Sequence, residues 1–223
     1  MDLGNVFSLY VTSNGVMRHH LKMIVPEGIG RIIRRVVRRS GAFFGGPDLC
    51  MAQAGLAVPS APLPAGYALA APIDATLWAE LLSAGGELGP WDEHRLRTET
   101  TCLVPGTQVF VTHGPLPVAC AGVYDRDSAS WEIGWIAVRP GHRRCGLGQA
   151  VTLLALERAR GLVARTILLF TQDHRLDAIR LYLRLGFRPA LRHRTHKRRW
   201  LALSQYLPRE VAADIVSSLQ VNQ

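Results

Sequence analysis

Residues 138–148 read Val-Arg-Pro-Gly-His-Arg-Arg-Cys-Gly-Leu-Gly and stand between an apolar run, 130–138, and an amphipathic run, 149–160. The apolar run predicts a strand and the amphipathic run predicts a helix, so the residues between them form a loop that opens a helix. Such a loop directs unpaired backbone N–H groups and the positive end of the helix dipole at one point. This arrangement suits a pyrophosphate group.

Glycines and arginines strengthen this interpretation of the loop. Gly146 and Gly148 let the backbone approach an anion without a Cβ in the way, and Arg143 and Arg144 add positive charge. Two other phosphate-binding motifs do not fit. No Gly-Lys-Ser/Thr is present, as a P-loop requires, and Gln149-Ala-Val follows where a dinucleotide-binding loop has its third glycine.

The loop resembles the acetyl-CoA pyrophosphate loop of the GNAT superfamily of acyltransferases. The family pattern Gln/Arg-x-x-Gly-x-Gly/Ala is matched by residues 143–148, after Val-x-Pro at 138–140. Downstream, residues 178–187 read Ala-Ile-Arg-Leu-Tyr-Leu-Arg-Leu-Gly-Phe, which is similar to the family's Ala-Ile-x-Leu-Tyr-x-x-Leu-Gly-Phe helix and turn. The two motifs in this order extend the resemblance over residues 65–205.

The resemblance implies acetyl-CoA as the acyl donor, with no metal. In this family the strand before the loop splays from its neighbour, which frees backbone groups to bind the pantetheine arm and the thioester. The Ile136 N–H would face the acetyl carbonyl and stabilise the charge that develops there. The implied donor-binding residues are Ile136, Ala137, Val138, Arg143, Arg144, Cys145, Gly146, Leu147, Gly148 and Gln149.

Two side chains are implied to move protons. Glu132 resembles the glutamate base of histone-type members, and Tyr182 matches the tyrosine that protonates the departing CoA thiolate. Because residues 132, 134, 136 and 138 share one face of a regular strand, we expect the Glu132 carboxylate and the Ile136 amide on one side. The alternatives are a solvated glutamate at a strand edge and a buried aromatic side chain on an amphipathic helix.

Three further positions qualify the resemblance. Arg175 stands where family members often have an asparagine that bonds the CoA arm. Cys145 is unusual in the loop, and we interpret it first as a small filler and second as a reactive thiol. His193 and His196 lack a cysteine or nearby acid, so we expect a basic surface turn rather than a metal site.

The fold class expected is α/β (α+β), with a mixed, mostly antiparallel central sheet flanked by helices. Residues 1–64 should form an N-terminal extension with three parts: a hairpin around Asn14-Gly15, a helix with an arginine stripe at 32–39, and a Gly/Ala/Pro-rich linker at 40–65. Residues 65–205 form the acyl-CoA-binding domain and 206–223 a tail. The hairpin strands should span 6–11 and 16–25.

Within the domain, the patterns predict a series of strands and helices whose last element is a strand. Gly161 and Gly186 stand where left-handed helix caps are expected. The expected strands are 67–71, 107–112, 118–124, 130–138, 166–171 and 200–205, and the expected helices are 74–82, 91–101, 149–160 and 176–185.

The chain has a formal net charge of +9, but this charge is unevenly distributed. Residues 1–64 hold seven basic and three acidic side chains, 65–185 hold twelve of each, and 186–223 hold seven and two. The central domain is therefore neutral, and the basic cluster at 188–199 should be solvated charge on a last hairpin. Nucleic acid is not an expected partner.

Composition sets the remaining expectations. With 48% hydrophobic residues and no apolar run long enough to span a membrane, we expect a soluble cytoplasmic protein. The sequence favours an acetyl-CoA-dependent N-acetyltransferase that acts by direct transfer on a small amine or a protein amine. The alternative is a non-catalytic CoA-binding module whose basic flanks dock on nucleic acid or an acidic protein.

Overall fold

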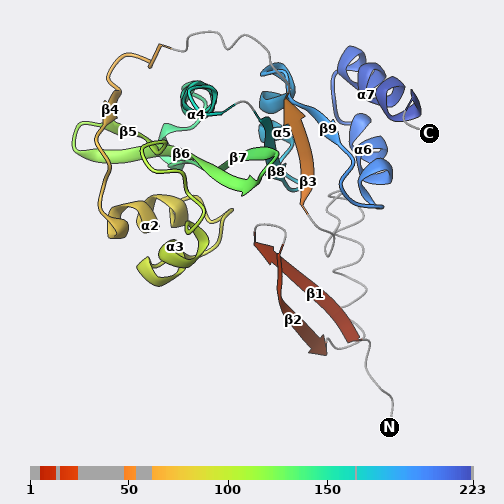
Figure 1. Cartoon of the computed structure of the whole chain (residues 1–223), viewed down its shortest axis with the longest axis horizontal. Coiled ribbons are helices and arrows are strands. Elements are labelled where there is room, and N and C mark those ends of the chain that lie inside the picture. The colour runs from red at the N-terminus through yellow and green to blue at the C-terminus, as the bar shows by residue number, and fades with distance from the viewer. Residues whose placement is uncertain (1–5, 14–15, 25–47, 54–61, 164, 222–223) are drawn as a thin grey trace. The chain divides into compact units, whose positions relative to one another are not determined.

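The computed structural model describes residues 6–13, 16–24, 48–53, 62–163 and 165–221 (Figure 1). The chain forms two compact units, one of residues 1–51 with 170–223 and one of residues 52–169. Each unit is described by itself. The helix predicted at 32–39 lies outside the described residues.

The N-terminal hairpin is confirmed. Strands β1 (Val6–Ser13) and β2 (Val16–Ile24) pair antiparallel, with the pairing shifted between Val11 and Thr12. The predicted turn residues, Asn14-Gly15, lie outside the described residues.

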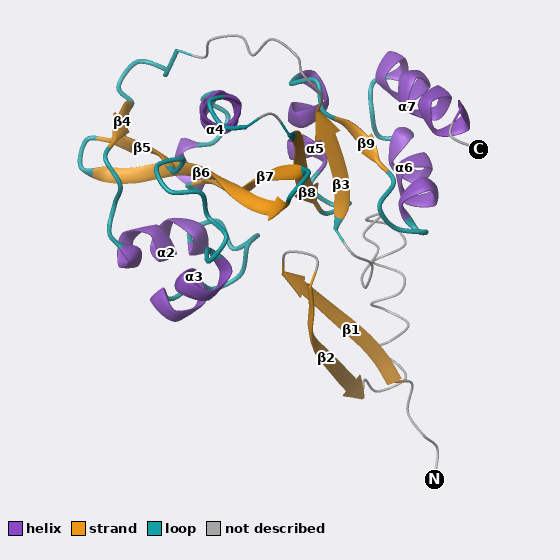
Figure 2. Cartoon of the chain, viewed as in Figure 1, coloured by secondary structure: helices purple, strands orange, loops and turns teal. Residues whose placement is uncertain are grey.

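The predicted mixed sheet is also confirmed, with seven strands in the order β4-β5-β6-β7-β8-β3-β9 (Figure 2). From β4 to β7 the pairing is antiparallel, whereas β7 and β8 are parallel. The strands are β3 (Leu49–Gln53), β4 (Ala68–Ala70), β5 (Val109–His113), β6 (Leu116–Asp127), β7 (Ser130–Val138), β8 (Thr166–Thr171) and β9 (Arg188–Ala190).

Helices cover both faces of the sheet in the unit of residues 52–169. Helices α2 (Ala75–Ser83) and α3 (Glu93–Glu99) lie on one face of β5 to β7, and α4 (Leu147–Arg160) lies on the other (Figure 1). On the first face, Trp78 of α2 meets Phe110 of β5 edge to face, with ring centroids 5.3 Å apart. This contact packs α2 onto the sheet that also carries the loop after β7.

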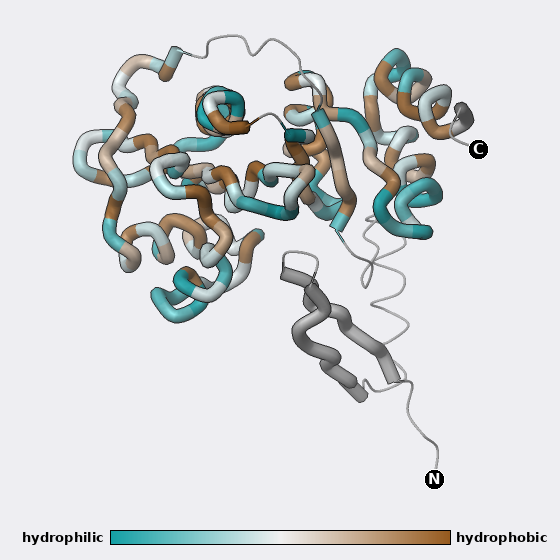
Figure 3. The backbone as a smooth tube through the Cα atoms, in the orientation of Figure 1, coloured by the Kyte–Doolittle hydropathy of each residue, from teal (hydrophilic) through white to brown (hydrophobic). Residues whose placement is uncertain are grey.

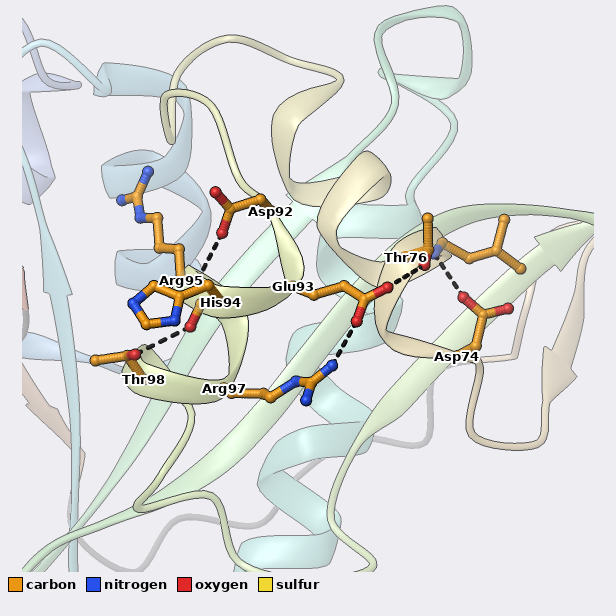
Figure 4. A network of polar contacts seen from close by, with 9 residues as sticks. Asp74, Thr76, Asp92, Glu93, His94, Arg95, Arg97 and Thr98 are labelled. Atoms are coloured by element: carbon orange, nitrogen blue, oxygen red, sulfur yellow. Dashed lines mark hydrogen bonds and ion pairs between the residues drawn. The ribbon is translucent and has the colours of Figure 1, made fainter.

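The α2–α3 corner is held by polar contacts (Figure 4). Asp74 caps α2 by accepting from the Leu77 N–H at 2.8 Å, and Asp92 caps α3 by accepting from the Arg95 N–H at 2.7 Å. The Glu93 carboxylate accepts from the Thr76 hydroxyl at 2.7 Å, which ties the two helices together. Helix α3 is otherwise hydrophilic (Figure 3).

The strand predicted at 200–205 is wrong, because this segment is helical. Helix α6 spans His196–Ser204, and it buries His196, Arg199, Trp200 and Leu203. These positions follow the spacing of one helix face, and this signal outweighs the alternating apolar residues that favoured a strand. The predicted tail likewise contains a helix, α7 (Arg209–Val221). No helix in the described part of the chain is long and apolar enough to span a membrane.

The linker predicted at 40–65 is also wrong in part, because β3 lies inside it. Leu49, Cys50 and Met51 are fully buried, and β3 stands between β8 and β9 in the sheet. Its short apolar run is flanked by Gly- and Pro-rich segments, which concealed it in the sequence. The domain boundaries at 64 and 205 stay predictions.

Of the two predicted glycine caps, one is confirmed. Gly186 follows α5 (Leu176–Arg184) with φ of +87°, and the Phe187 N–H returns to the Tyr182 carbonyl. Gly161 has φ of −69°, so α4 ends in a right-handed conformation and that prediction is wrong.

Candidate active site

The open edge of β7 is the first element of the site. Strands β7 and β8 pair only from Ser130 opposite Thr166 to Glu132 opposite Leu168. Beyond Glu132, β7 continues to Val138 with β6 as its remaining partner. Residues 130–133 are buried, whereas 134–138 are partly exposed. Among the described residues, the backbone of this second half therefore has no strand partner on the β8 side, which is the arrangement that the family resemblance implies.

A β-bulge interrupts β7 at the same place. Cys120 pairs with Ala137 but Gly122 pairs with Gly134, so β7 has one residue more than β6 between the two pairs. Trp135, within the bulge, has φ of +50°. The bulge shifts the alternation of side chains, since cross-strand partners share a face.

This bulge corrects one prediction. Glu132 and Gly134 share their face with Ala137 rather than with Ile136 and Val138, because the extra residue reverses the alternation. A regular strand was assumed, and a left-handed tryptophan is not evident from residue type. The relation of Glu132 to the Ile136 amide therefore depends on the bulge and not on strand parity.

The orientation of the Ile136 amide follows from its neighbour. The Trp135 carbonyl accepts a hydrogen bond from the Cys120 thiol at 3.4 Å. In a trans peptide the next N–H points the opposite way, so the Ile136 N–H points away from Cys120. Its predicted contact with the acetyl carbonyl stays a prediction.

The N-terminus of α4 is the second element of the site. Gly146 is the N-cap, with φ of +83°, and the first helical bond runs from the Ala150 N–H to its carbonyl at 3.0 Å. The first turn has no acidic residue and no side-chain cap. Within the described residues no acceptor is found for the N–H groups of Cys145, Gly146, Leu147, Gly148 and Gln149. The positive end of the helix is thus open to an anion.

Arg143 links the loop to the segment that follows α2. Its Nη2 lies 2.7 Å from Oε2 of Glu87, and its Nε donates to the Val138 carbonyl at 3.3 Å. A Cβ on Gly85 would stand 2.5 Å from Arg143 Nη2 and 2.8 Å from Glu87 Oε2. Gly85 therefore permits the ion pair by close approach. The sequence assigned the charge of Arg143 to the anion alone, whereas the structure shares it with Glu87.

An aromatic cluster beside the loop was not foreseen from the sequence. The Tyr67 hydroxyl lies 3.1 Å from Nδ1 of His142, and the ring of His113 is 5.3 Å from each of their rings. Desolvation and the neighbouring Cys145 thiol raise the pKa of Tyr67. The cluster joins residues from three segments, so no local pattern could have indicated it.

Glu132 is buried rather than solvated. Only 7% of the residue is exposed, and its Oε2 lies 3.2 Å from Nη1 of Arg126. Tyr124 stands directly across from it on β6. The alternative of a solvated glutamate at a strand edge is therefore wrong. The ion pair places the Arg126 guanidinium beside the carboxylate.

Tyr182 lies on α5, in the unit formed by residues 1–51 and 170–223. Its ring meets the ring of Phe187 edge to face at 6.2 Å. Burial raises its pKa to about 12, and Arg175 acts in the opposite direction. The phenol therefore keeps its proton at neutral pH.

The same unit corrects the expectation for the C-terminal basic cluster. Arg199 is buried with Asp173, the two side chains are each 4% exposed, and their atoms lie 3.0 Å apart. His196 is buried rather than in a surface turn, and this burial lowers its pKa. Helix formation turns both side chains inward. Among the described residues, no group of three or more His, Cys, Asp or Glu could hold a metal ion.

The family follows from this geometry and from comparison. Residues 72–187 match the sequence model of the acetyltransferase (GNAT) family, which is more than half of the chain. The chain belongs to this family, so the predicted resemblance is confirmed. No curated protein sequence matches the chain.

Solved structures support the fold. A Drosophila protein aligns with 74% of this chain and 56% of its own, at 17% identity and a TM-score of 0.52. A GCN5-related N-acetyltransferase from Sphaerobacter thermophilus aligns with 71% of this chain and 53% of its own, at 19% identity and 0.50. One from Kribbella flavida aligns with 70% and 60%, at 22% identity and 0.49. The chain thus spans 53–60% of the length of these three structures.

These neighbours confirm the predicted fold class, a mixed sheet flanked by helices in the GNAT arrangement. The family binds acetyl-CoA and an amine acceptor, which is a small molecule or a protein. The family match covers residues 72–187, so strands β3, β4 and β9 of the sheet lie outside it.

Proposed function

We propose that this protein is an N-acetyltransferase that moves the acetyl group of acetyl-CoA to a primary amine by direct transfer in a ternary complex. The observation that carries the proposal is the uncapped N-terminus of α4 directly after the free edge of β7, within a GNAT family match. Along the chain, a row of unpaired strand amides is followed by an anion site. This order suits a long thioester that carries phosphate groups.

The donor would bind along this path. The N–H groups of residues 145–149 would receive the pyrophosphate, and the edge of residues 136–138 would bind the pantetheine arm by hydrogen bonds of the strand type. Arg144 is exposed at the loop and Arg143 is shared with Glu87, so their charge attracts the donor rather than enclosing it.

The reaction begins with loss of a proton from the acceptor. An ammonium group is deprotonated by the Glu132 carboxylate, because an amine is largely protonated at neutral pH and only its lone pair can attack. The new N–C bond forms at the thioester carbonyl, whose oxygen takes the electron pair and receives the Ile136 N–H. The carbonyl then re-forms as the C–S bond breaks, the electron pair leaves with the sulfur of CoA, and the nitrogen gives its second proton to solvent, which leaves the neutral amide.

Tyr182 would stabilise the departing sulfur. With a pKa of about 12, its phenol holds its proton and is a hydrogen-bond donor at every physiological pH. A CoA thiol is more acidic than this phenol, so a shared proton in the transition state fits better than complete transfer. The thiolate can then take its proton from solvent.

The properties of the Cys120 thiol, which lies beside the bulge, are consistent with direct transfer. Cys120 is buried and donates to the Trp135 carbonyl, and burial raises its pKa to about 12. A thiol of this kind is a poor nucleophile, because the thiolate is the reactive form. An acyl intermediate on Cys120 is therefore disfavoured.

The test is acetyl-CoA turnover with a panel of small amines and peptides. We expect Glu132→Gln and Tyr182→Phe each to lower kcat by roughly 10- to 1,000-fold, the range of general acid–base catalysis and of a lost transition-state donor. Tyr206→Phe removes a hydroxyl from an exposed tyrosine and is the control.

Two results would contradict the proposal in different ways. Full activity in both variants would remove the roles of Glu132 and Tyr182. Tight acetyl-CoA binding without transfer to any amine, together with salt-sensitive binding of nucleic acid, would favour the non-catalytic module instead.

A further inference from the structure

A pair of glycines faces the helices α2 and α3 from the middle of the sheet. Gly122 on β6 and Gly134 on β7 are direct cross-strand partners, so they share one face. Neither has φ in the left-handed region. Their lack of a side chain therefore leaves room above the sheet rather than permitting an unusual backbone.

The side chains of Tyr124, Glu132 and Leu103 fill this room, and a Cβ on Gly122 would lie 2.9 Å from Cδ1 of Leu103. A Cβ on Gly134 would lie 3.2 Å from Oε1 of Glu132 and 3.3 Å from Cε2 of Tyr124. A Cβ on Gly122 would lie 3.2 Å from the same Cε2 and 3.2 Å from the Tyr124 hydroxyl. The Tyr124 ring thus spans both glycines, and the Glu132 carboxylate extends along β7 toward the bulge.

The Tyr124 hydroxyl is a buried polar group without a partner among the described residues. Only 4% of Tyr124 is exposed. Burial raises its pKa well above the ordinary value, and Cys120 and Glu132 act in the same direction. The hydroxyl is therefore neutral and can donate. A buried donor without a partner costs free energy, so its retention next to a carboxylate has to be explained.

We propose that Tyr124 is a positioning residue for the base: its hydroxyl donates, through one bridging water molecule, to the Glu132 carboxylate and holds it toward the acceptor amine. The proposal rests on the role of Glu132 in the proposed function. Tyr124 neither gains nor loses a proton in the reaction, because the proton leaves the amine and ends on Glu132. A buried hydroxyl that lacks a protein partner is commonly satisfied by an ordered water molecule.

Groups from two neighbouring strands and one loop face Glu132 and Tyr124. On β6, Arg126 is its ion-pair partner and Cys120 is the nearest thiol to Tyr124. On β8, the residues that pair with β7 are Thr166, Ile167 and Leu168, which do not titrate. From the loop before β5, Leu103 reaches Gly122 with its apolar side chain. Arg126 and Tyr124 are thus two groups on β6 that face the carboxylate.

The test is the pH profile of kcat/KM for Tyr124→Phe. A hydrogen bond to a carboxylate favours its charged form and lowers its pKa, so the loss of that bond raises the pKa. We expect the acidic limb of the profile to move to higher pH by about half a unit to one unit. We also expect kcat to fall by about 10-fold, with the Kd of acetyl-CoA unchanged.

A second variant probes the room above the glycines. In Gly134→Ala the new Cβ presses on both Glu132 and Tyr124, and we expect a lower kcat and a shift in the same direction. Tyr206→Phe, at an exposed tyrosine, should show the wild-type profile. Circular dichroism and thermal melting confirm that each variant is folded.

Each outcome decides the matter. A wild-type profile in Tyr124→Phe, or a lower kcat without movement of the acidic limb, overturns the positioning role and leaves only packing. If Glu132→Gln also retains full activity, the proposed base is wrong, and the proposed function fails there. If Glu132→Gln loses activity and Tyr124→Phe does not, only the assignment of Tyr124 fails.

Discussion

Helices α2 and α4 lie in the same unit and begin in opposite ways. Asp74 closes α2 with its own carboxylate, which accepts from the Leu77 N–H, and Asp92 does the same for α3. Helix α4 begins at Gly146 with no side-chain cap and no acid in its first turn. A helix that supplies its own carboxylate has no use for an external anion, whereas α4 remains incomplete until one binds.

The largest effect is expected when α4 is made to resemble α2. In Gly146→Asp, a carboxylate would occupy the position of the pyrophosphate, cap the free N–H groups and repel the donor. We expect acetyl-CoA to bind at least about 100-fold more weakly, as measured by calorimetry.

The matched control for this variant is Gly106→Asp. Gly106 has φ of +77°, close to the +83° of Gly146, and a Cβ there meets nothing within 4 Å. It imposes the same backbone strain and the same charge away from the loop. If both variants weaken binding equally, the loss at Gly146 reflects strain rather than the anion site.

The reverse change, removal of the cap from α2, should affect stability and not binding. Asp74→Ala leaves the Leu77 N–H without its acceptor, which costs about 1 kcal/mol. For a chain of this size, we expect the melting temperature to fall by about 2–4 °C. The Kd of acetyl-CoA should stay within about two-fold, and a larger change would show that the two helix starts are not independent.

A smaller effect is expected from the ion pair that links the corner to the loop. In Glu87→Gln, Arg143 loses the carboxylate at 2.7 Å and its charge becomes available to the donor. Because both side chains are partly exposed, we expect acetyl-CoA binding to tighten by only about two- to three-fold at low salt. Glu80→Gln, on the exposed face of α2, makes the same change of charge and serves as the control. Weaker binding in Glu87→Gln would mean that Arg143 serves the loop only as a brace.

The smallest effect is expected on the stability of α3 at low pH. The Thr76 hydroxyl and Arg97 lower the pKa of Glu93 below its ordinary value of 4.5. Its contribution to stability is therefore present above this value and is lost as pH falls through the lower, folded-state pKa. Hydrogen exchange at pH 5 and pH 3 should show α3 loosening more than α4. Glu93→Gln should remove that difference, and equal loosening of both helices in the wild type would contradict it.

Local patterns predicted the parts of the site that depend on local chemistry. The loop, β7 and α4 were foreseen because Gly146 and Gly148 follow an apolar strand and precede an amphipathic helix. Strand β7 has the bounds expected, Ser130–Val138. Asp74 was foreseen as a helix start, since a short acceptor precedes the first helical turn.

The rest depends on contacts between distant residues. The partner of Arg143 is Glu87, 56 positions away, and only the structure shows that both side chains lie close to Gly85. The bulge places Trp135 in a left-handed backbone conformation, and the presence of a tryptophan does not indicate that conformation in a sequence. The helical spacing of residues 196, 199, 200 and 203 was present in the sequence, and counting it would have found α6.

The free edge of β7 has a consequence for the lifetime of the protein. Among the described residues, β7 ends its pairing with β8 at Glu132 and continues, partly exposed, to Val138, and an unpaired strand edge can pair with another extended chain. A bound donor would fill that edge and favour the native state in proportion to the logarithm of its concentration. In a cell poor in acetyl-CoA, the same molecule would therefore lose both its substrate and part of its protection against aggregation and proteolysis.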